Sequence, residues 1–231
     1  MKALLLDLDD TLLAYSAGVD DSWAQACGAA ALPVEAATLL AALAETRKWF
    51  WTGDPARHAR ERVNMLGAWS KIVAEALARC GCADETLAAA IAREYAAHRR
   101  DTMRLFPETR AFLDALHARG LPLALVTNGD AVQQRDKIER HDLARYFGAI
   151  LIEGEFGCGK PEARVYREAL RRLGVGPEGV WMVGDHLEWD VLAPQRLGLT
   201  GVWIDREGAG LPAEADAQPH RIIGSLSELL A

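Results

Sequence analysis

Hydrophobic and polar positions follow two patterns along this chain. Short apolar runs predict buried strands, and apolar residues that recur every three or four positions predict amphipathic helices. The first apolar run, residues 3–6, ends directly at a polar segment that begins with Asp7. From residue 107 onward, segments of the two kinds alternate. The later predicted strands are residues 122–126, 149–152, 180–183, 202–204 and 221–223.

Predicted helices separate these strands. They cover residues 107–119 and 164–173, and further helices begin at residues 131 and 225. Alternation of helix and strand is typical of a parallel sheet with helices on both faces. We therefore expect an α/β fold with a doubly wound parallel sheet. Ligands of such sheets bind beyond the carboxyl ends of the strands, where the strand order reverses.

Between the first strand and the rest of the sheet, the pattern is helical without interruption. Parallel strands are normally joined by much shorter crossovers, so this segment reads as an insertion. We expect an α/β core formed by residues 1–14 and 103–231 and an inserted all-helical cap domain at residues 15–102. The predicted cap helices are residues 22–31, 34–51, 56–79 and 84–103.

Composition excludes several classes of protein. The chain has 231 residues, is 50% hydrophobic and carries a net charge of -7. An acidic average argues against a general nucleic-acid binder, because phosphate backbones are bound by basic surfaces. No stretch approaches the ~20 apolar residues that span a bilayer, and the first run is too short for a signal peptide. We expect a cytoplasmic protein, a monomer or a homodimer, without nucleic-acid or membrane partners.

Two carboxylates follow the first predicted strand. Asp7 and Asp9 are two positions apart, so they project in the same general direction from the strand end and can share a site. Carboxylates that lie so close repel each other unless a proton or a divalent cation lies between them. The pair therefore predicts a raised pKa or a bound metal. A plain polar turn at a strand end is the alternative.

Other polar residues follow the later strands. Thr127 and Asn128 offer donors to an anion, and Lys160 brings a compact cation on a glycine-rich loop. Asp185 follows the next strand, and Asp190 lies five residues later. Without the other segments, Thr127 and Asn128 would read as a helix cap, and the two aspartates as charges at a helix N-terminus.

In this order, the four segments resemble the motifs of the haloacid dehalogenase-like hydrolase superfamily, subclass I, whose members carry a helical cap after the first motif. The second half is similar to the branch of N-acylneuraminate-9-phosphatase and 5'-nucleotidase. His186, Trp189 and Pro194 depart from that branch. The residues that carry the second resemblance are Thr127, Asn128, Gly129, Asp130, Gln134, Arg135, Lys137, Ile138, Glu139 and the segment from Gly184 to Asp190.

The chemistry of the residues and the resemblance imply the same roles. Asp7 is the expected nucleophile, which forms an aspartyl phosphate, and Asp9 is the expected general acid and base. Thr127, Asn128 and Lys160 are expected to bind and neutralise the phosphoryl group, with Thr127 and Lys160 also counted as catalytic. The predicted substrate is a small phosphorylated metabolite, a sugar phosphate or a nucleotide monophosphate.

Hard oxygen ligands beside a phosphate favour Mg²⁺. The expected ligands are Asp7, the backbone carbonyl of Asp9 and Asp185, with Asp190 in support. Trp49 and Trp51 are additional candidates for substrate binding, because aromatic and cationic residues interleave at residues 47–54 between two cap helices. The alternative for both tryptophans is a place in the core of the helical bundle.

Three other functions are weighed against the phosphatase. A phosphomutase on the same fold is disfavoured because Asp10 stands where the resembling mutases usually have glycine. A 2-haloacid dehalogenase is disfavoured by Asp9, since the resembling dehalogenases lack the second aspartate. A non-catalytic binding protein leaves unexplained why every catalytic position of the motifs is filled.

Overall fold

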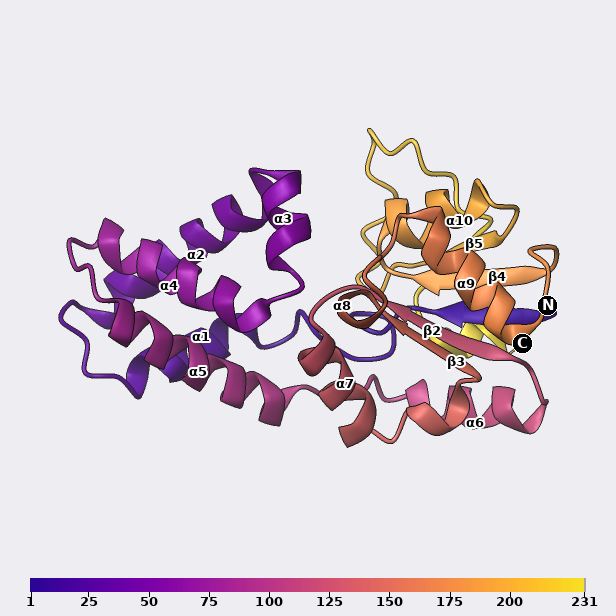
Figure 1. The fold of residues 1–231 in the computed structure, drawn as a ribbon, viewed down its shortest axis with the longest axis horizontal. Coiled ribbons are helices and arrows are strands. Elements are labelled where there is room, and N and C mark those ends of the chain that lie inside the picture. Colours follow the sequence, from indigo (N-terminus) through magenta and orange to yellow (C-terminus); the bar gives the residue numbers. More distant parts are fainter. Residues whose placement is uncertain (231) are drawn as a thin grey trace. The chain divides into compact units, whose positions relative to one another are not determined.

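The computed structural model describes residues 1–230 and divides the chain into two compact units. One unit comprises Met1–Tyr15 and Arg104–Ala231, and the other comprises Ser16–Met103. The first unit contains a parallel sheet with surrounding helices, whereas the second consists of helices and their connections (Figure 1).

The sheet has six parallel strands in the order β3-β2-β1-β4-β5-β6. The chain first builds outward from β1 to β2 and β3, then returns to the other side of β1 and continues through β4. The order therefore reverses between β1 and β4, and the predicted doubly wound α/β fold is confirmed. The strands are β1 (Ala3–Leu6), β2 (Leu123–Thr127), β3 (Ala149–Ile152), β4 (Val180–Gly184), β5 (Thr200–Ile204) and β6 (Arg221–Ile223).

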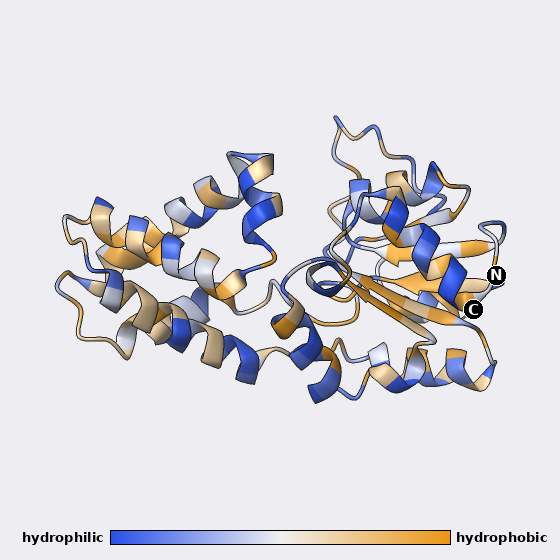
Figure 2. Ribbon diagram, in the orientation of Figure 1, coloured by the Kyte–Doolittle hydropathy of each residue, from blue (hydrophilic) through white to orange (hydrophobic). Residues whose placement is uncertain are grey.

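The central strands are buried on both faces, which explains their continuous apolar runs. All residues of β1 and β2 are buried, and Figure 2 shows the sheet as a largely hydrophobic layer. Helix α9 packs on β2 and β3 through one apolar side, while its other side is rich in arginine. The helices of this unit are α6 (Thr109–Ala118), α7 (Ala131–Arg140), α8 (Glu153–Phe156), α9 (Ala163–Leu173) and α10 (Ala193–Gln195), with the short 3-10 helices η1 (Ala144–Tyr146) and η3 (Leu226–Leu229) and the π-helix η2 (Leu187–Leu192).

The helical unit has its own hydrophobic core. Trp23 stacks on Tyr95 with ring centroids 3.7 Å apart, and Trp69 meets the same tyrosine edge-on. Aromatic pairs of this geometry add to the stability gained by burial. In residues 1–230, no helix is long and apolar enough to cross a membrane. The helices of the unit are α1 (Val19–Gly28), α2 (Ala36–Thr52), α3 (Pro55–Glu61), α4 (Met65–Arg79) and α5 (Glu85–Thr102).

The prediction of one helix over residues 56–79 is wrong, because the chain forms α3 and α4 there. Asn64 ends the continuity: its side chain accepts a hydrogen bond from the backbone N–H of Gly67 at 3.2 Å and caps α4. Asp84 caps α5 in the same way, since its carboxylate accepts from the backbone N–H of Leu87 at 2.8 Å. Side-chain caps of this kind satisfy N–H groups that a helix leaves unpaired at its start.

Within the α/β unit, the two ends of the helical segment are tied to each other. Leu13 and Leu105 form an antiparallel bridge, and the backbone N–H of Ala14 donates to the carbonyl of Arg104 at 2.9 Å. The chain therefore leaves the sheet region and returns to it at neighbouring points.

Leu5→Ala should lower the free energy of unfolding by about 2–5 kcal/mol, because the Leu5 side chain is fully buried in the centre of the sheet. Val132→Ala is the control, since Val132 is 77% exposed and should change stability by less than about 0.5 kcal/mol. Urea unfolding followed by circular dichroism measures both. Equal effects of the two substitutions would contradict the assignment of Leu5 to the core.

Candidate functional site

Three carboxylates meet where the strand order reverses. Asp7 directly follows β1 and Asp185 directly follows β4, and these strands are neighbours in the sheet. Asp190 comes from the short π-helix η2 that follows β4. Each of the three residues offers a carboxylate oxygen, and these oxygens lie within 4.8 Å of one another. The aspartates that follow the first and fourth strands therefore converge at the edge where the sheet topology favours a ligand.

Lys160 lies between two of these carboxylates. Its ammonium donates to Oδ1 of Asp7 and to Oδ1 of Asp190, both at 2.7 Å, and its side chain is almost fully buried. Asn128 holds the backbone of Lys160 from both sides. The N–H of Lys160 donates to Asn128 Oδ1, and Asn128 Nδ2 donates to the Lys160 carbonyl, each at 2.7 Å. Asn128 thus positions the lysine, and its predicted contact with phosphate stays a prediction.

Asp190 is fully buried and depends on the absence of a side chain at Gly184. A Cβ at Gly184 would lie 2.2 Å from Oδ2 of Asp190, far inside van der Waals contact. The same Asp190 oxygen accepts a hydrogen bond from the backbone N–H of His186 at 3.1 Å. Glycine at the end of β4 therefore allows the carboxylate to pack against the strand.

Burial and mutual repulsion shift the pKa values of the carboxylates in this cluster. Burial raises the pKa of Asp7 from 3.8 to about 7; Lys160 opposes this shift, while Asp190 and Asp9 add to it. Part of the Asp185 residue is exposed to solvent, but protein atoms surround its carboxylate. This desolvation, together with the charges of Asp7 and Asp190, raises the pKa of Asp185 to about 8. Burial alone would lower the pKa of Lys160, but Asp190 and Asp7 raise it above its ordinary value.

This donor set fits a divalent cation. The cluster holds three carboxylates but one ammonium, which contacts Asp7 and Asp190, so it lacks positive charge. Carboxylate oxygens are the ligands that Mg²⁺ prefers. Of the predicted ligands, Asp7 and Asp185 come together with Asp190. The side chain of Asp9 lies outside this group, and the expected metal contact of its backbone carbonyl stays a prediction.

Asp9 is held by residues whose roles the sequence analysis missed. Lys137 donates to both Asp9 carboxylate oxygens at 2.9 and 2.8 Å, and Gln134 Nε2 donates to Oδ2 at 3.1 Å. Gln134 Nε2 also donates to Thr127 Oγ1 at 2.6 Å. Gln134 and Lys137 are spaced by three positions on α7, so they share one side of that helix. Both residues belong to the segment that carries the resemblance to the N-acylneuraminate-9-phosphatase branch, and this resemblance was the available signal.

The turn after β1 is fixed by a third residue that the sequence analysis missed. Arg206 donates to the carbonyls of Asp10 and Thr11 and pairs with Glu108 at 2.8 Å. Asp10 has a φ of 54°, in the left-handed region that aspartate tolerates better than most residues. The guanidinium therefore stabilises the bend that carries Asp7 and Asp9.

Trp49 and Trp51 belong to α2 of the helical unit and take no part in the carboxylate cluster. The Trp49 side chain is 46% exposed, and the guanidinium of Arg57 lies 4.2 Å from its ring centroid. Arg57 also donates to the carbonyls of Trp49 and Phe50. Trp51 is partly buried against the bundle core. The expected contribution of both tryptophans to substrate binding stays a prediction.

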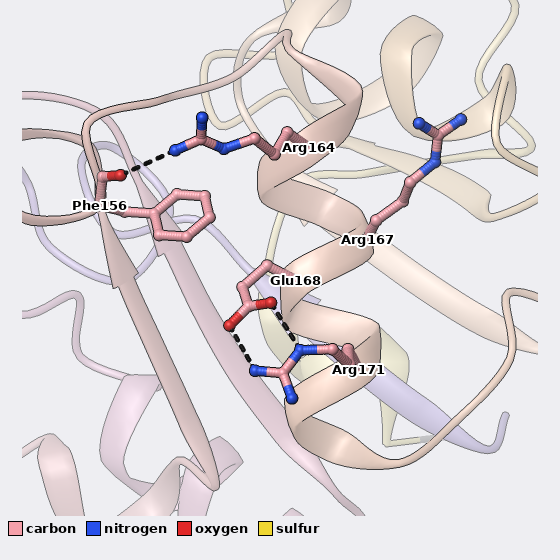
Figure 3. Close-up of a pocket in the computed structure, with 5 residues that line it drawn as sticks. All are labelled: Phe156, Arg164, Arg167, Glu168 and Arg171. Carbon is pink, nitrogen blue, oxygen red and sulfur yellow. Dashed lines mark hydrogen bonds and ion pairs between the residues drawn. The ribbon is translucent and has the colours of Figure 1, made fainter.

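A hollow of about 390 Å³ lies beside α9, and its lining residues are Phe156, Arg164, Arg167, Glu168 and Arg171. Figure 3 shows Glu168 facing Arg171 and Arg164 pointing to the Phe156 carbonyl. Arg171 Nε donates to Glu168 Oε2 at 2.7 Å, and the Arg164 guanidinium donates to the Phe156 carbonyl at 3.2 Å. None of the predicted site residues lines this hollow, so it is separate from the carboxylate cluster.

Comparisons with known proteins show which family and which relatives this chain is similar to. The haloacid dehalogenase-like hydrolase family matches residues 1–198. A phosphoserine phosphatase of Thermus thermophilus is 38% identical over 257 residues, which covers 99% of this chain and 98% of that protein. Human N-acylneuraminate-9-phosphatase is 33% identical over 164 residues, 71% of this chain and 64% of that protein. The solved structure of the HAD-hydrolase YfnB from Bacillus subtilis, bound to magnesium, has a TM-score of 0.76 at 20% identity, with 99% and 96% of the two chains covered.

The chain therefore belongs to the haloacid dehalogenase-like hydrolase family. The resemblance stated from its motifs is confirmed, because the family match extends over most of the chain. The similarity to N-acylneuraminate-9-phosphatase is found as well. The expected enzyme class, a phosphoric monoester hydrolase, agrees with both relatives, which are phosphatases.

Asp185→Asn should stabilise the metal-free protein more as the pH rises. In the folded protein the Asp185 carboxyl keeps its proton up to about pH 8, whereas in the unfolded chain it releases it near 3.8. The unmodified protein therefore loses stability between these pH values, and asparagine, which does not titrate, avoids that loss. Because Asp185 reaches solvent and is screened, we expect a gain of about 1 kcal/mol at pH 9.

Urea unfolding in EDTA at about pH 4 and about pH 9 measures this difference. Asp216→Asn, an exposed aspartate of the same unit, is the control and should stay within about 0.5 kcal/mol at both values. A gain from Asp185→Asn that is no larger at the higher pH would contradict the account of a charge-crowded cluster.

Proposed function

We propose that this chain is a Mg²⁺-dependent phosphatase that hydrolyses a small phosphorylated metabolite through an aspartyl phosphate on Asp7. The observation that carries the proposal is the Asp7 carboxylate itself. It is buried at the switch point of the sheet, held by Lys160, and faced by two further carboxylates. A buried, oriented carboxylate beside cations suits nucleophilic attack on phosphorus.

The chain's own residues supply the other parts of the reaction. Lys160 orients Asp7 and offers positive charge beside the position of a phosphoryl group. Thr127, at the end of β2, offers a hydroxyl donor to phosphoryl oxygens. A divalent cation held by Asp7, the Asp9 carbonyl and Asp185, with Asp190 in support, would supply further positive charge to the nucleophile and the phosphate.

Asp9 has a task distinct from that of Asp7. It would give a proton to the departing alkoxide and later take one from the water that hydrolyses the aspartyl phosphate. Its side chain is 25% exposed, which leaves it accessible to a substrate and to water, in contrast to the buried Asp7. A second carboxylate with this access favours phosphate hydrolysis over dehalogenation, because a leaving halide needs no proton.

The proposal extends to the substrate and to the helical unit. A sugar phosphate or a nucleotide monophosphate is the expected class, and the similarity to N-acylneuraminate-9-phosphatase supports the former. The helical residues 15–102 would act as a cap on the core formed by residues 1–14 and 103–231. Trp49, exposed and stacked under Arg57, is the more accessible of the two tryptophans proposed to bind substrate.

Asp7→Asn and Asp9→Asn should have different effects on p-nitrophenyl phosphate hydrolysis. Asp7→Asn removes the nucleophile and should eliminate both turnover and phosphoenzyme. Asp9→Asn keeps the nucleophile, so Asp7 can still be phosphorylated by a substrate with a good leaving group. Dephosphorylation should then slow by about 10²- to 10⁴-fold, the usual value of general base catalysis, after an initial burst of p-nitrophenol.

Rapid-quench kinetics with mass spectrometry of the quenched protein would show the burst and the added phosphate. Asp216→Asn is the control and should keep the unmodified rate, since Asp216 is exposed and lies outside the site. Turnover by Asp7→Asn would reject the nucleophile assignment.

Metal dependence is the second test of the proposal. Dialysis against EDTA should abolish hydrolysis of p-nitrophenyl phosphate, and Mg²⁺ should restore it. Ca²⁺ should not, because it takes more ligands at longer distances and would let both Asp7 oxygens bind. Initial rates at fixed substrate measure the effect, and full activity after removal of metal would end the metal-assisted account.

A further inference from the structure

Lys137 is a buried lysine whose hydrogen-bonding capacity is fully used. Its ammonium has three N–H donors, and it has three acceptors: both carboxylate oxygens of Asp9 and Oε1 of Gln134 at 2.6 Å. The ring of Tyr15 faces the same ammonium at 4.3 Å. Only 4% of Lys137 is exposed, so this geometry is enclosed by protein.

Gln134 is fixed in one orientation by its neighbours. Its amide oxygen must face Lys137, because an ammonium can only donate. Its amide nitrogen then faces three acceptors, namely Oδ2 of Asp9, Oγ1 of Thr127 and the carbonyl of Asn128, at 3.1, 2.6 and 3.0 Å. The side chain is 2% exposed. A flipped amide would place the NH₂ group against the Lys137 ammonium and the amide oxygen against the three oxygen acceptors.

This orientation determines which way the Thr127 hydroxyl can donate. Since Thr127 Oγ1 accepts from Gln134, its own hydrogen remains for another acceptor. The acceptor within the protein is the Asn128 carbonyl at the long distance of 3.4 Å. A phosphoryl oxygen would offer a better partner, so Gln134 prepares the hydroxyl as a donor.

We propose that Lys137 and Gln134 are positioning residues of the active site, which hold the Asp9 carboxylate and the Thr127 hydroxyl in one fixed arrangement. The inference rests on the proposed phosphatase function and deepens it. α7 begins at Ala131, capped by Asp130, four residues after the end of β2. The helix therefore links the proposed acid of one strand end to the proposed phosphate anchor of the next.

The proposed role has a consequence that a purely structural role lacks. If Lys137 aims Asp9 at the leaving oxygen, its loss should matter most when that oxygen needs a proton. A p-nitrophenolate ion leaves readily without one, whereas a phenolate ion without the nitro group benefits more from protonation. A lysine that only stabilised the fold would affect both substrates in proportion.

The test is a series of substituted phenyl phosphates measured with Lys137→Met in the full-length protein with Mg²⁺. The fall in kcat/KM should be about tenfold larger for phenyl phosphate than for p-nitrophenyl phosphate. The dependence of kcat/KM on the pKa of the leaving group should therefore be steeper than in the unmodified protein. Arg140→Met is the matched control, because Arg140 is a cation of the same helix that pairs with Asp136. Its dependence on the leaving group should equal that of the unmodified protein.

A combined variant separates direct from indirect effects. Lys137→Met together with Asp9→Asn should show no steeper dependence than Asp9→Asn alone, because the lysine acts through Asp9. Gln134→Met should raise the inhibition constant of inorganic phosphate severalfold, through the lost orientation of Thr127. Lys137→Met should change that constant much less.

An equal loss for all substrates with Lys137→Met, at unchanged circular dichroism, would overturn the proposal. If that variant fails to fold, Lys137→Arg gives the same comparison. Arginine keeps the charge but presents a planar group that cannot reproduce the contacts of the ammonium. The dependence of kcat/KM on leaving-group pKa should therefore steepen in this variant as well, and an equal loss for all substrates would overturn the proposal. Absence of phosphatase activity in the unmodified protein would instead reject the proposed function.

Discussion

One ammonium group between carboxylates is the interaction on which the site depends. Lys160 is almost fully buried, and the two charges that keep it there, on Asp7 and Asp190, are themselves buried. Removing a single member of such a group leaves an uncompensated charge inside the protein, which is far more costly than losing a surface ion pair. The positions of β1, β4 and the loop around Lys160 are therefore coupled through electrostatics as well as through packing.

The same constraint explains several choices of small or amide residues around it. Gly184 makes room for Asp190, and Asn128 uses both ends of its amide to hold the backbone of Lys160. These residues touch the site without contributing charge. They let the cluster keep three carboxylates and one lysine at short distances, an arrangement that is unstable by itself and suits a bound cation.

Much of the fold was predictable because continuous apolar runs mark strands buried on both faces, and the polar residues after them mark the ligand edge. The prediction of a single helix over residues 56–79 was wrong because apolar periodicity continues across Asn64. The capping contact of Asn64 is local and does not interrupt that periodicity. The contacts of Lys137 and Gln134 with Asp9 were not predicted, for a different reason. Their partner Asp9 lies 128 and 125 positions away, and spacing along the chain does not reveal such contacts. The convergence of Asp7 and Asp185 was foreseeable, since adjacent parallel strands end at one edge.

The tie between the two ends of the helical segment has a consequence for how this architecture can diversify. Leu13 pairs with Leu105, and Ala14 with Arg104. These paired backbone segments form a short neck where the chain enters and leaves residues 16–103. Segments whose ends lie close together can be lengthened, shortened or exchanged without altering the register of the sheet. The strand ends that carry the carboxylates and the inserted helices can thus evolve as separate modules. A different insertion grafted onto this neck would leave the strand ends that carry Asp7 and Asp185 unchanged.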